Sequence, residues 1–278
     1  MIIGGELMAT SEELAALVSS ESARLLEYFK GLSPSDWETQ SACDAWTNAD
    51  VVAHMVMAVD MFSMNIERGA NGDSSPPEGM GPPQETDLAA RMAANATRAV
   101  AVRESLGDTL VEAFGQNCER LGVLLDRMGP EDWDKPCYHP AAMLTVSRYM
   151  NLRLAEMSVH EWDIRSRLES SAKLPDAVAP EVIDLLPGFV VGRLFQPGAN
   201  IARASRFRFN LTDGGSYDIV AGGGELRMEA STGAAADVTF TCNGSTFALL
   251  AYGRFTVEDA VAAGDITVEG NRELAAQF

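Results

Sequence analysis

Glu156 and His160 lie four residues apart within residues 145–167, TVSRYMNLRLAEMSVHEWDIRSR. If this segment is helical, the spacing places a carboxylate and an imidazole one turn apart on one face. Tyr149, Leu152 and Asp163 share that face, so the pair would lie among partly apolar neighbours. Both side chains are ligands that divalent metals accept. The alternative is an exposed polar pair that stabilises the helix by a few tenths of a kcal/mol.

The chain has only three histidines, and a second one lies in another strongly helical run. His54 belongs to residues 48–69, NADVVAHMVMAVDMFSMNIERG. A histidine on one helix that faces the Glu156–His160 pair on another would give a bundle three ligands for a divalent cation. His139 follows Tyr138 and precedes a proline, so we expect it in a turn at the surface. Asp163 would either orient the ring of His160 or be an exposed helix acid.

Four helical regions with apolar residues at helical spacing would position these ligands. Thr10 or Ser11 could cap the first, Thr47 or Asn48 could cap the second, and Gly107 should break the third. Residues 32–50, LSPSDWETQSACDAWTNAD, lead into the second region, and their composition predicts an irregular Trp-containing segment pinned against the bundle by Trp37 and Trp46. We expect Cys43 to have a packing role there. These regions are residues 11–30, 48–69, 88–128 and 145–167.

The segment 69–87 contains NGDSSPPEGMGPPQETD and has too few apolar residues to pack. Its proline and glycine content predicts a mobile loop. The loop could be a tolerated surface insertion or a lid over the metal site.

Beyond residues 174–180, which contain two prolines and predict a domain boundary, the pattern changes to alternating and β-branched segments. These segments predict an antiparallel sheet: RFRFNLT, SYDIVA, ELRMEA and DVTFTCN. Helices are expected in STFALLAYG, TVEDAVAAG and NRELAAQF, with a short strand in ITVEG.

Composition limits the class of protein. A net charge of −19 over 278 residues, without a Lys/Arg run, argues against nucleic-acid binding. The absence of an apolar run near 18 residues argues against a membrane span, and the first residues lack the pattern of a secretory signal, so we expect a cytoplasmic protein. Four cysteines without a C-x-x-C motif indicate reduced thiols. A small-molecule substrate and a monomer or small homo-oligomer are expected.

With both halves described, the chain resembles the mycothiol-dependent maleylpyruvate isomerase family over nearly all of its length. The resemblance is carried by DWETQSACDAW followed by DVVAHM, by LRLAEMSVHEWDI, and by GRFTVEDAVAAGDITVEGNRELAAQF near the end. It implies a mixed fold class, α plus α/β in two domains. These would be a DinB-like four-helix bundle over residues 1–172, and a small sterol-carrier-like (SCP2-like) α+β domain with an antiparallel sheet over residues 173–278.

The resemblance also implies a site and a reaction. His54, Glu156 and His160 would hold a divalent metal, usually zinc, and Arg254 would be the catalytic arginine near the end of the chain, unless it is only a charge at a helix terminus. Three protein ligands leave an open coordination position, which is typical of a catalytic zinc. A low-molecular-weight thiol such as mycothiol would add as thiolate to a cis-enoyl keto acid and be eliminated after rotation, giving the trans isomer.

Two other functions stay open. The same centre would suit a thiol S-transferase that conjugates electrophiles. In a third interpretation the protein is not an enzyme: the metal is structural and the second domain carries an apolar ligand. The sequence supplies no evident fourth ligand of the kind that a structural zinc has, which favours an enzyme.

Overall fold

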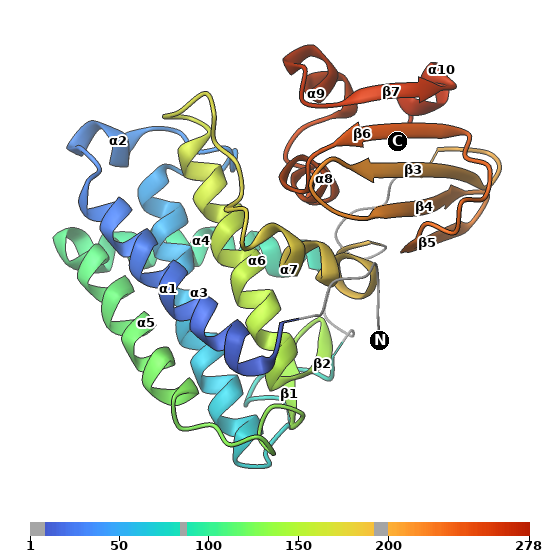
Figure 1. Ribbon diagram of the computed structural model, residues 1–278. Coiled ribbons are helices and arrows are strands. Elements are labelled where there is room, and N and C mark those ends of the chain that lie inside the picture. The colour runs from blue at the N-terminus through green and yellow to red at the C-terminus, as the bar shows by residue number, and fades with distance from the viewer. Residues whose placement is uncertain (1–8, 84–87, 192–199) are drawn as a thin grey trace. The chain divides into compact units, whose positions relative to one another are not determined.

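The computed structural model describes residues 9–83, 88–191 and 200–278, which form two compact units, Ala9–Ala172 and Lys173–Phe278. The first unit is helical and the second combines helices with a five-stranded sheet (Figure 1). The mixed α plus α/β fold class is therefore confirmed.

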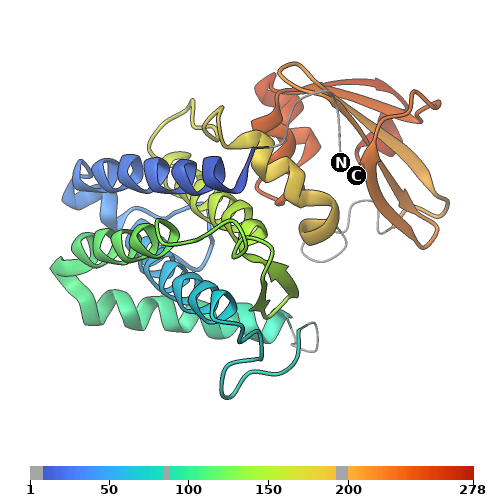
Figure 2. The same cartoon turned by 60° about the horizontal axis from the view of Figure 1, so that its bottom comes forward.

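The first unit is built on a four-helix bundle. In this bundle α3 packs against α5 and α6, and α1 packs against the same two helices, so the four form a closed ring (Figures 1 and 2). The helix α4 packs against α3 and also contacts α5. The bounds of the helices are Ser11–Lys30 for α1, Asn48–Ala70 for α3, Leu88–Leu106 for α4, Leu110–Leu125 for α5 and Val146–Arg165 for α6.

The helix ends follow from capping residues. The side chains of Thr10 and Thr47 each accept a hydrogen bond from the backbone N–H three residues on, and the carboxylates of Glu13 and Asp50 accept one from the backbone N–H of the cap residue. Such capping boxes satisfy backbone N–H groups that the first helical turn leaves unpaired. The third helical region breaks at Gly107, as predicted, where a short 3₁₀ turn joins α4 to α5.

Short elements in the linkers were missed. The helix α2 (Pro34–Glu38) occupies part of the first Trp-containing segment, and a hairpin of β1 (Pro136–His139) and β2 (Ala142–Thr145) precedes α6. The prediction that His139 lies at the surface is wrong, because it is buried and its Nδ1 accepts a hydrogen bond from the N–H of Ala141. Residues 71–83 form no helix or strand, and residues 84–87 of the expected loop lie outside the described residues.

The second unit has a sheet in the order β5-β4-β3-β6-β7. Three of the four strand pairings are antiparallel, which confirms the predicted antiparallel sheet, and the parallel pairing of β3 with β6 is the one that was not predicted. The residues between β5 and β6 cross back to the free side of β3 instead of forming a hairpin, and the new strand then runs in the same direction. The strands are Ser205–Leu211 (β3), Ser216–Gly222 (β4), Glu225–Ala230 (β5), Val238–Cys242 (β6) and Thr267–Gly270 (β7).

The sheet buries aromatic side chains on one face. Phe209 packs against Phe240 and Phe247 with ring centroids 4.7 and 4.5 Å apart. The helices α8 (Gly244–Ala251), α9 (Val257–Ala263) and α10 (Arg272–Ala275) confirm the predicted ones. The helix α7 (Ala179–Leu185), with a π-helical turn after it, was not predicted.

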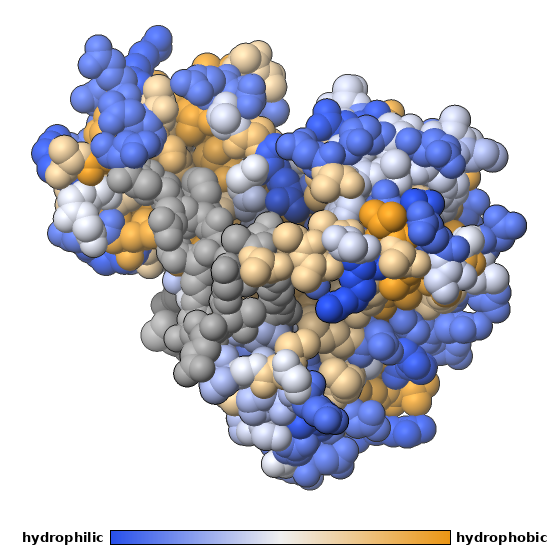
Figure 3. Space-filling view, turned by 180° about the vertical axis from the view of Figure 1, so that it is seen from behind, coloured by the Kyte–Doolittle hydropathy of each residue, from blue (hydrophilic) through white to orange (hydrophobic). Residues whose placement is uncertain are grey.

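One helix among the described residues, α3, is long and apolar enough to cross a membrane. It is also the central helix of the bundle, and 61% of the apolar stretch is buried inside the protein. Hydrophilic side chains cover much of the face seen in Figure 3, and the strongly apolar ones lie in smaller patches between them.

Candidate metal centre

Two helices bring the three expected ligands together. His54 lies on α3 less than two turns after its Thr47 cap, and Glu156 and His160 lie on α6. Each offers one ligand atom, and these atoms lie within 4.8 Å of one another. His54 Nε2 is 3.9 Å from Glu156 Oε1, and the two imidazole rings meet edge to face with centroids 4.8 Å apart.

Two atoms of this cluster lack the partners that buried polar groups require. Glu156 Oε1 and His54 Nδ1 are both buried, and neither has a hydrogen-bond partner among the described residues. A buried acceptor without a partner costs about 1–3 kcal/mol. A divalent cation would remove the cost at Glu156, and two imidazoles with one carboxylate form a donor set that zinc accepts. The residues present therefore fit a divalent metal.

Asp163 orients His160. Its Oδ2 lies 2.8 Å from His160 Nδ1, and the carboxylate is fully buried, so it is not an exposed helix acid. Since Nδ1 donates its proton to Asp163, Nε2 is the nitrogen of His160 that a metal can bind once that nitrogen is deprotonated.

Burial and charge shift the pKa values of the two histidines in opposite directions. Burial, reinforced by the charge of His160, lowers the pKa of His54 to about 3. Burial also lowers the pKa of His160, but hydrogen bonds to Asp163 and Cys43 and the nearby carboxylates outweigh it and raise this pKa to about 10. The neutral ring of His54 is ready to bind a cation, while His160 must first lose a proton.

The segment before α3 contacts the residues of the centre. The backbone N–H of Ala42 donates to the carbonyl oxygen of Asp163 at 2.8 Å, which fixes Cys43 so that its thiol donates to Asp163 Oδ2 at 3.2 Å. Cys43 therefore lies at the site rather than only packing against the bundle. Trp46, also in this segment, stacks on His54 with centroids 5.0 Å apart. The prediction that aromatics pin this segment is confirmed.

Arg153 is a site residue that the sequence reasoning missed. Its guanidinium is fully buried and donates to Glu156 Oε2. It lies four residues after Tyr149 and three before Glu156, so the spacing that singled out the other residues of this face could have found it.

Arg254 belongs to the other unit. It follows α8, where its backbone N–H donates to the carbonyl oxygen of Leu249 and its side chain donates to that of Tyr252 at 3.2 Å. These bonds resemble the helix-terminal alternative, and a catalytic role stays a prediction.

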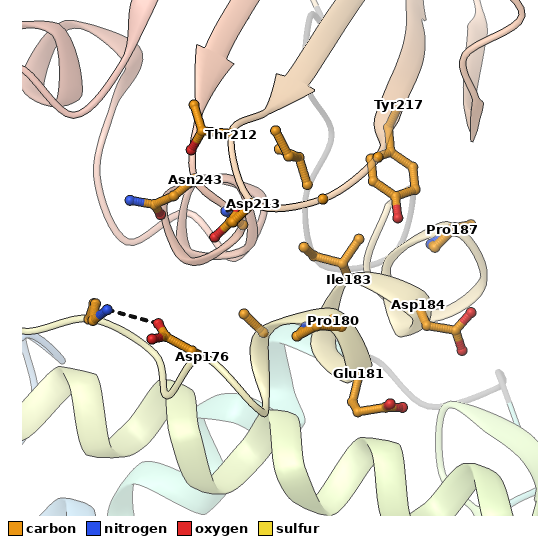
Figure 4. A pocket seen from close by; sticks show the side chains of 16 residues that line it. Asp176, Pro180, Glu181, Ile183, Asp184, Pro187, Thr212, Asp213, Tyr217 and Asn243 are labelled. Atoms are coloured by element: carbon orange, nitrogen blue, oxygen red, sulfur yellow. Dashed lines mark hydrogen bonds and ion pairs between the residues drawn. The ribbon is translucent and has the colours of Figure 1, made fainter. Parts of the chain in front are cut away.

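The second unit also holds a cavity of about 550 Å³ between α7 and the ends of the strands (Figure 4). In the figure Ile183 and Pro180 come from α7, and Tyr217 points toward them from β4. The lining includes four carboxylates and one cation: Asp176, Glu181, Asp184, Asp213 and Lys173. Because Lys173 pairs with Asp176, the lining is acidic, which does not suit a purely apolar ligand.

The bond between His160 and Asp163 should contribute to the affinity of the candidate centre for a metal. Replacing Asp163 by Asn removes the carboxylate that fixes the Nδ1 proton of His160, and metal affinity should fall by about 10–100-fold, as is typical of such partners. Competition with a chelator measures this. The control is Asp60→Asn, which removes an exposed acid of α3 that pairs with Arg120. Equal metal retention in Asp163→Asn and wild type would contradict the orienting role.

Comparisons with known proteins agree with this architecture. Residues 18–165 match the mycothiol maleylpyruvate isomerase N-terminal domain, and residues 177–277 match the MDMPI C-terminal domain. A comparison with the curated proteins finds no match.

Among solved structures, the crystal structure of the mycothiol-dependent maleylpyruvate isomerase superposes with a TM-score of 0.61 at 14% identity, covering 94% of this chain and 93% of that one. A histidine-to-alanine mutant of the mycothiol-dependent maleylpyruvate isomerase gives 0.60 at 13% identity, with the same coverage. The fold is therefore shared over nearly the whole chain. The two domain matches together show that the chain belongs to the mycothiol-dependent maleylpyruvate isomerase family.

Proposed function

We propose that the protein is a metal- and thiol-dependent enzyme that isomerises a cis-enoyl keto acid to its trans form. The observation that carries the proposal is the cluster of His54, Glu156 and His160, whose ligand atoms lie within 4.8 Å of one another. The family adds the thiol, mycothiol, and the class of substrate.

A divalent cation held by these three residues would supply a positive charge that favours the thiolate form of a bound thiol and polarises a carbonyl. The other roles at the centre belong to side chains of the protein. Asp163 holds the Nδ1 proton of His160, and Trp46 covers one face of His54. Three protein ligands leave coordination positions for thiol and substrate. The catalytic arginine is proposed to be Arg254.

The thiol S-transferase is the closest alternative, because it needs the same centre. Free thiol separates the two reactions: isomerisation returns the thiol, whereas conjugation consumes it in proportion to product. The binding-protein alternative is less well supported, because the cavity of the second unit is lined by carboxylates.

The test is an assay of the metal-loaded protein with maleylpyruvate and mycothiol. We expect trans product to form only when the thiol is present, with the free-thiol concentration unchanged at the end. Arg254→Ala should lower this rate while the protein keeps its metal. Loss of thiol matched to product would identify a transferase, and absence of both reactions would refute the proposal.

A further inference from the structure

Arg153 is a buried cation beside the metal centre. It lies on α6, its side chain has no exposed surface, and its Nη1 donates to Glu156 Oε2. Its Nη2 lies 3.6 Å from the sulfur of Cys118 on α5, and the guanidinium lies 6.0 Å from the centre of the Phe114 ring. A buried charge persists when it is paired and hydrogen-bonded. Among the described residues, the other contacts of the guanidinium are a thiol and an aromatic ring, so Glu156 is the partner that balances this charge.

The two oxygens of Glu156 therefore have different environments. Oε2 is engaged by Arg153. Oε1 is buried, lies 3.9 Å from His54 Nε2, and has no hydrogen-bond partner in the part of the chain that the structure describes. Oε2 is thus occupied by its bond to Arg153, whereas Oε1 lies beside the other ligand atoms.

We propose that Arg153 is a positioning residue that restricts Glu156 to a single-oxygen ligand of the divalent cation. This inference rests on the proposed function, because it assumes a metal at these residues. A carboxylate bound through both oxygens takes up one more coordination position than a carboxylate bound through one. Arg153 thereby keeps that position open for a thiol or a substrate oxygen.

The pair also sets the charge of the centre. The positive charge of Arg153 cancels the negative charge of Glu156, and the imidazoles of His54 and His160 bind a metal in their neutral forms. Asp163 then carries the remaining negative charge, so a divalent cation would leave the centre net positive. This charge favours an anionic ligand, such as a thiolate or the carboxylate of a keto acid.

The experiment uses the full-length protein loaded with Co²⁺, whose visible absorption weakens as its coordination number rises. Arg153→Met removes the charge and the hydrogen bonds while filling a similar space. The visible absorption of Co²⁺ in this variant should weaken, because both oxygens of Glu156 become available to bind the metal. A chelator should also remove the metal from Arg153→Met at least about tenfold more slowly than from the wild type. Loss of a partner that merely orients a ligand has the opposite effect, because it lowers metal affinity by about 10–100-fold.

Two variants serve as controls. Arg153→Lys keeps a positive charge and one donor for Oε2, so it should restore the wild-type spectrum. Arg165→Met removes another arginine of α6, one that pairs with Glu161 and Glu169, and should change neither measurement. A wild-type spectrum in Arg153→Met, or faster loss of its metal, would overturn the proposal.

A crystal structure of the zinc-loaded wild type tests the proposal even if Arg153→Met does not fold. One Glu156 oxygen should bind the metal while the other stays on Arg153. A Glu156 bound through both oxygens would overturn the inference and leave the proposed enzyme activity intact. Single-oxygen binding in a protein without thiol-dependent activity would overturn the proposed enzyme activity and leave the inference about Arg153 intact. A wild type that binds no divalent metal would overturn both.

Discussion

His54→Ala and His160→Ala should each abolish stoichiometric metal binding, whereas the wild-type protein should hold about one equivalent of divalent metal. Each variant removes one of the three proposed ligands, whose candidate ligand atoms lie within 4.8 Å of one another. Loss of a partner that merely orients a ligand typically costs about 10–100-fold in affinity, and loss of a ligand itself should exceed that range. Elemental analysis after dialysis, at matched protein concentration, measures the effect.

His139 provides the matched control, because it is the third histidine of the chain. It lies in the β1–β2 hairpin, packs against Tyr149 with ring centroids 5.9 Å apart, and is not part of the cluster. His139→Asn should therefore keep the metal of the wild type. Wild-type metal content in both His54→Ala and His160→Ala would show that the ligands have been assigned wrongly.

The sequence predicted the parts of the centre that depend on periodicity and local capping. The spacing of Glu156 and His160 fixes their shared face once residues 145–167 are recognised as helical. Thr47 sets the start of α3 and hence the position of His54. These features need only the chain within one or two turns of each residue, which is why they could be found without a structure.

The parts that were missed depend on contacts between distant segments. Cys43 reaches Asp163 because the backbone of Ala42 is bonded to the carbonyl oxygen of Asp163, more than a hundred residues away. The burial of Arg153 depends on α5, which supplies Cys118 and Phe114. In the second unit, the alternation of residues predicted the strands but not the side of β3 on which β6 would pair. Local patterns carry no information about such pairings.

Metal affinity should rise about tenfold for each pH unit through the neutral range, or about a hundredfold from pH 6 to pH 8. Burial lowers the pKa of His160, but its hydrogen bonds to Asp163 and Cys43 and the neighbouring carboxylates raise it to about 10. The metal-free protein thus carries an imidazolium there at neutral pH. Its Nε2 proton must leave before a metal binds, while the Nδ1 proton stays on the bond to Asp163.

His54 adds nothing to this pH dependence, because its pKa is lowered to about 3 and its ring is already neutral. Binding should therefore release about one proton at pH 7. Calorimetry in buffers with different heats of ionisation counts that proton, after correction for the buffer's own binding of the metal. Release of about two protons, or of none, would contradict this assignment of the two histidines.

The contribution of His160 to the stability of the metal-free protein should fall as the pH rises, whereas metal affinity should rise. Its folded pKa of about 10 lies above the ordinary value of 6.5, so its ion pair contributes fully below about pH 6.5, and the contribution is lost as the pH rises toward 10. Asp163→Asn should weaken the pH dependence of both metal affinity and stability, since it removes the partner that raises the pKa of His160. If this variant kept the wild-type slope of metal affinity against pH, another group would have to supply the proton.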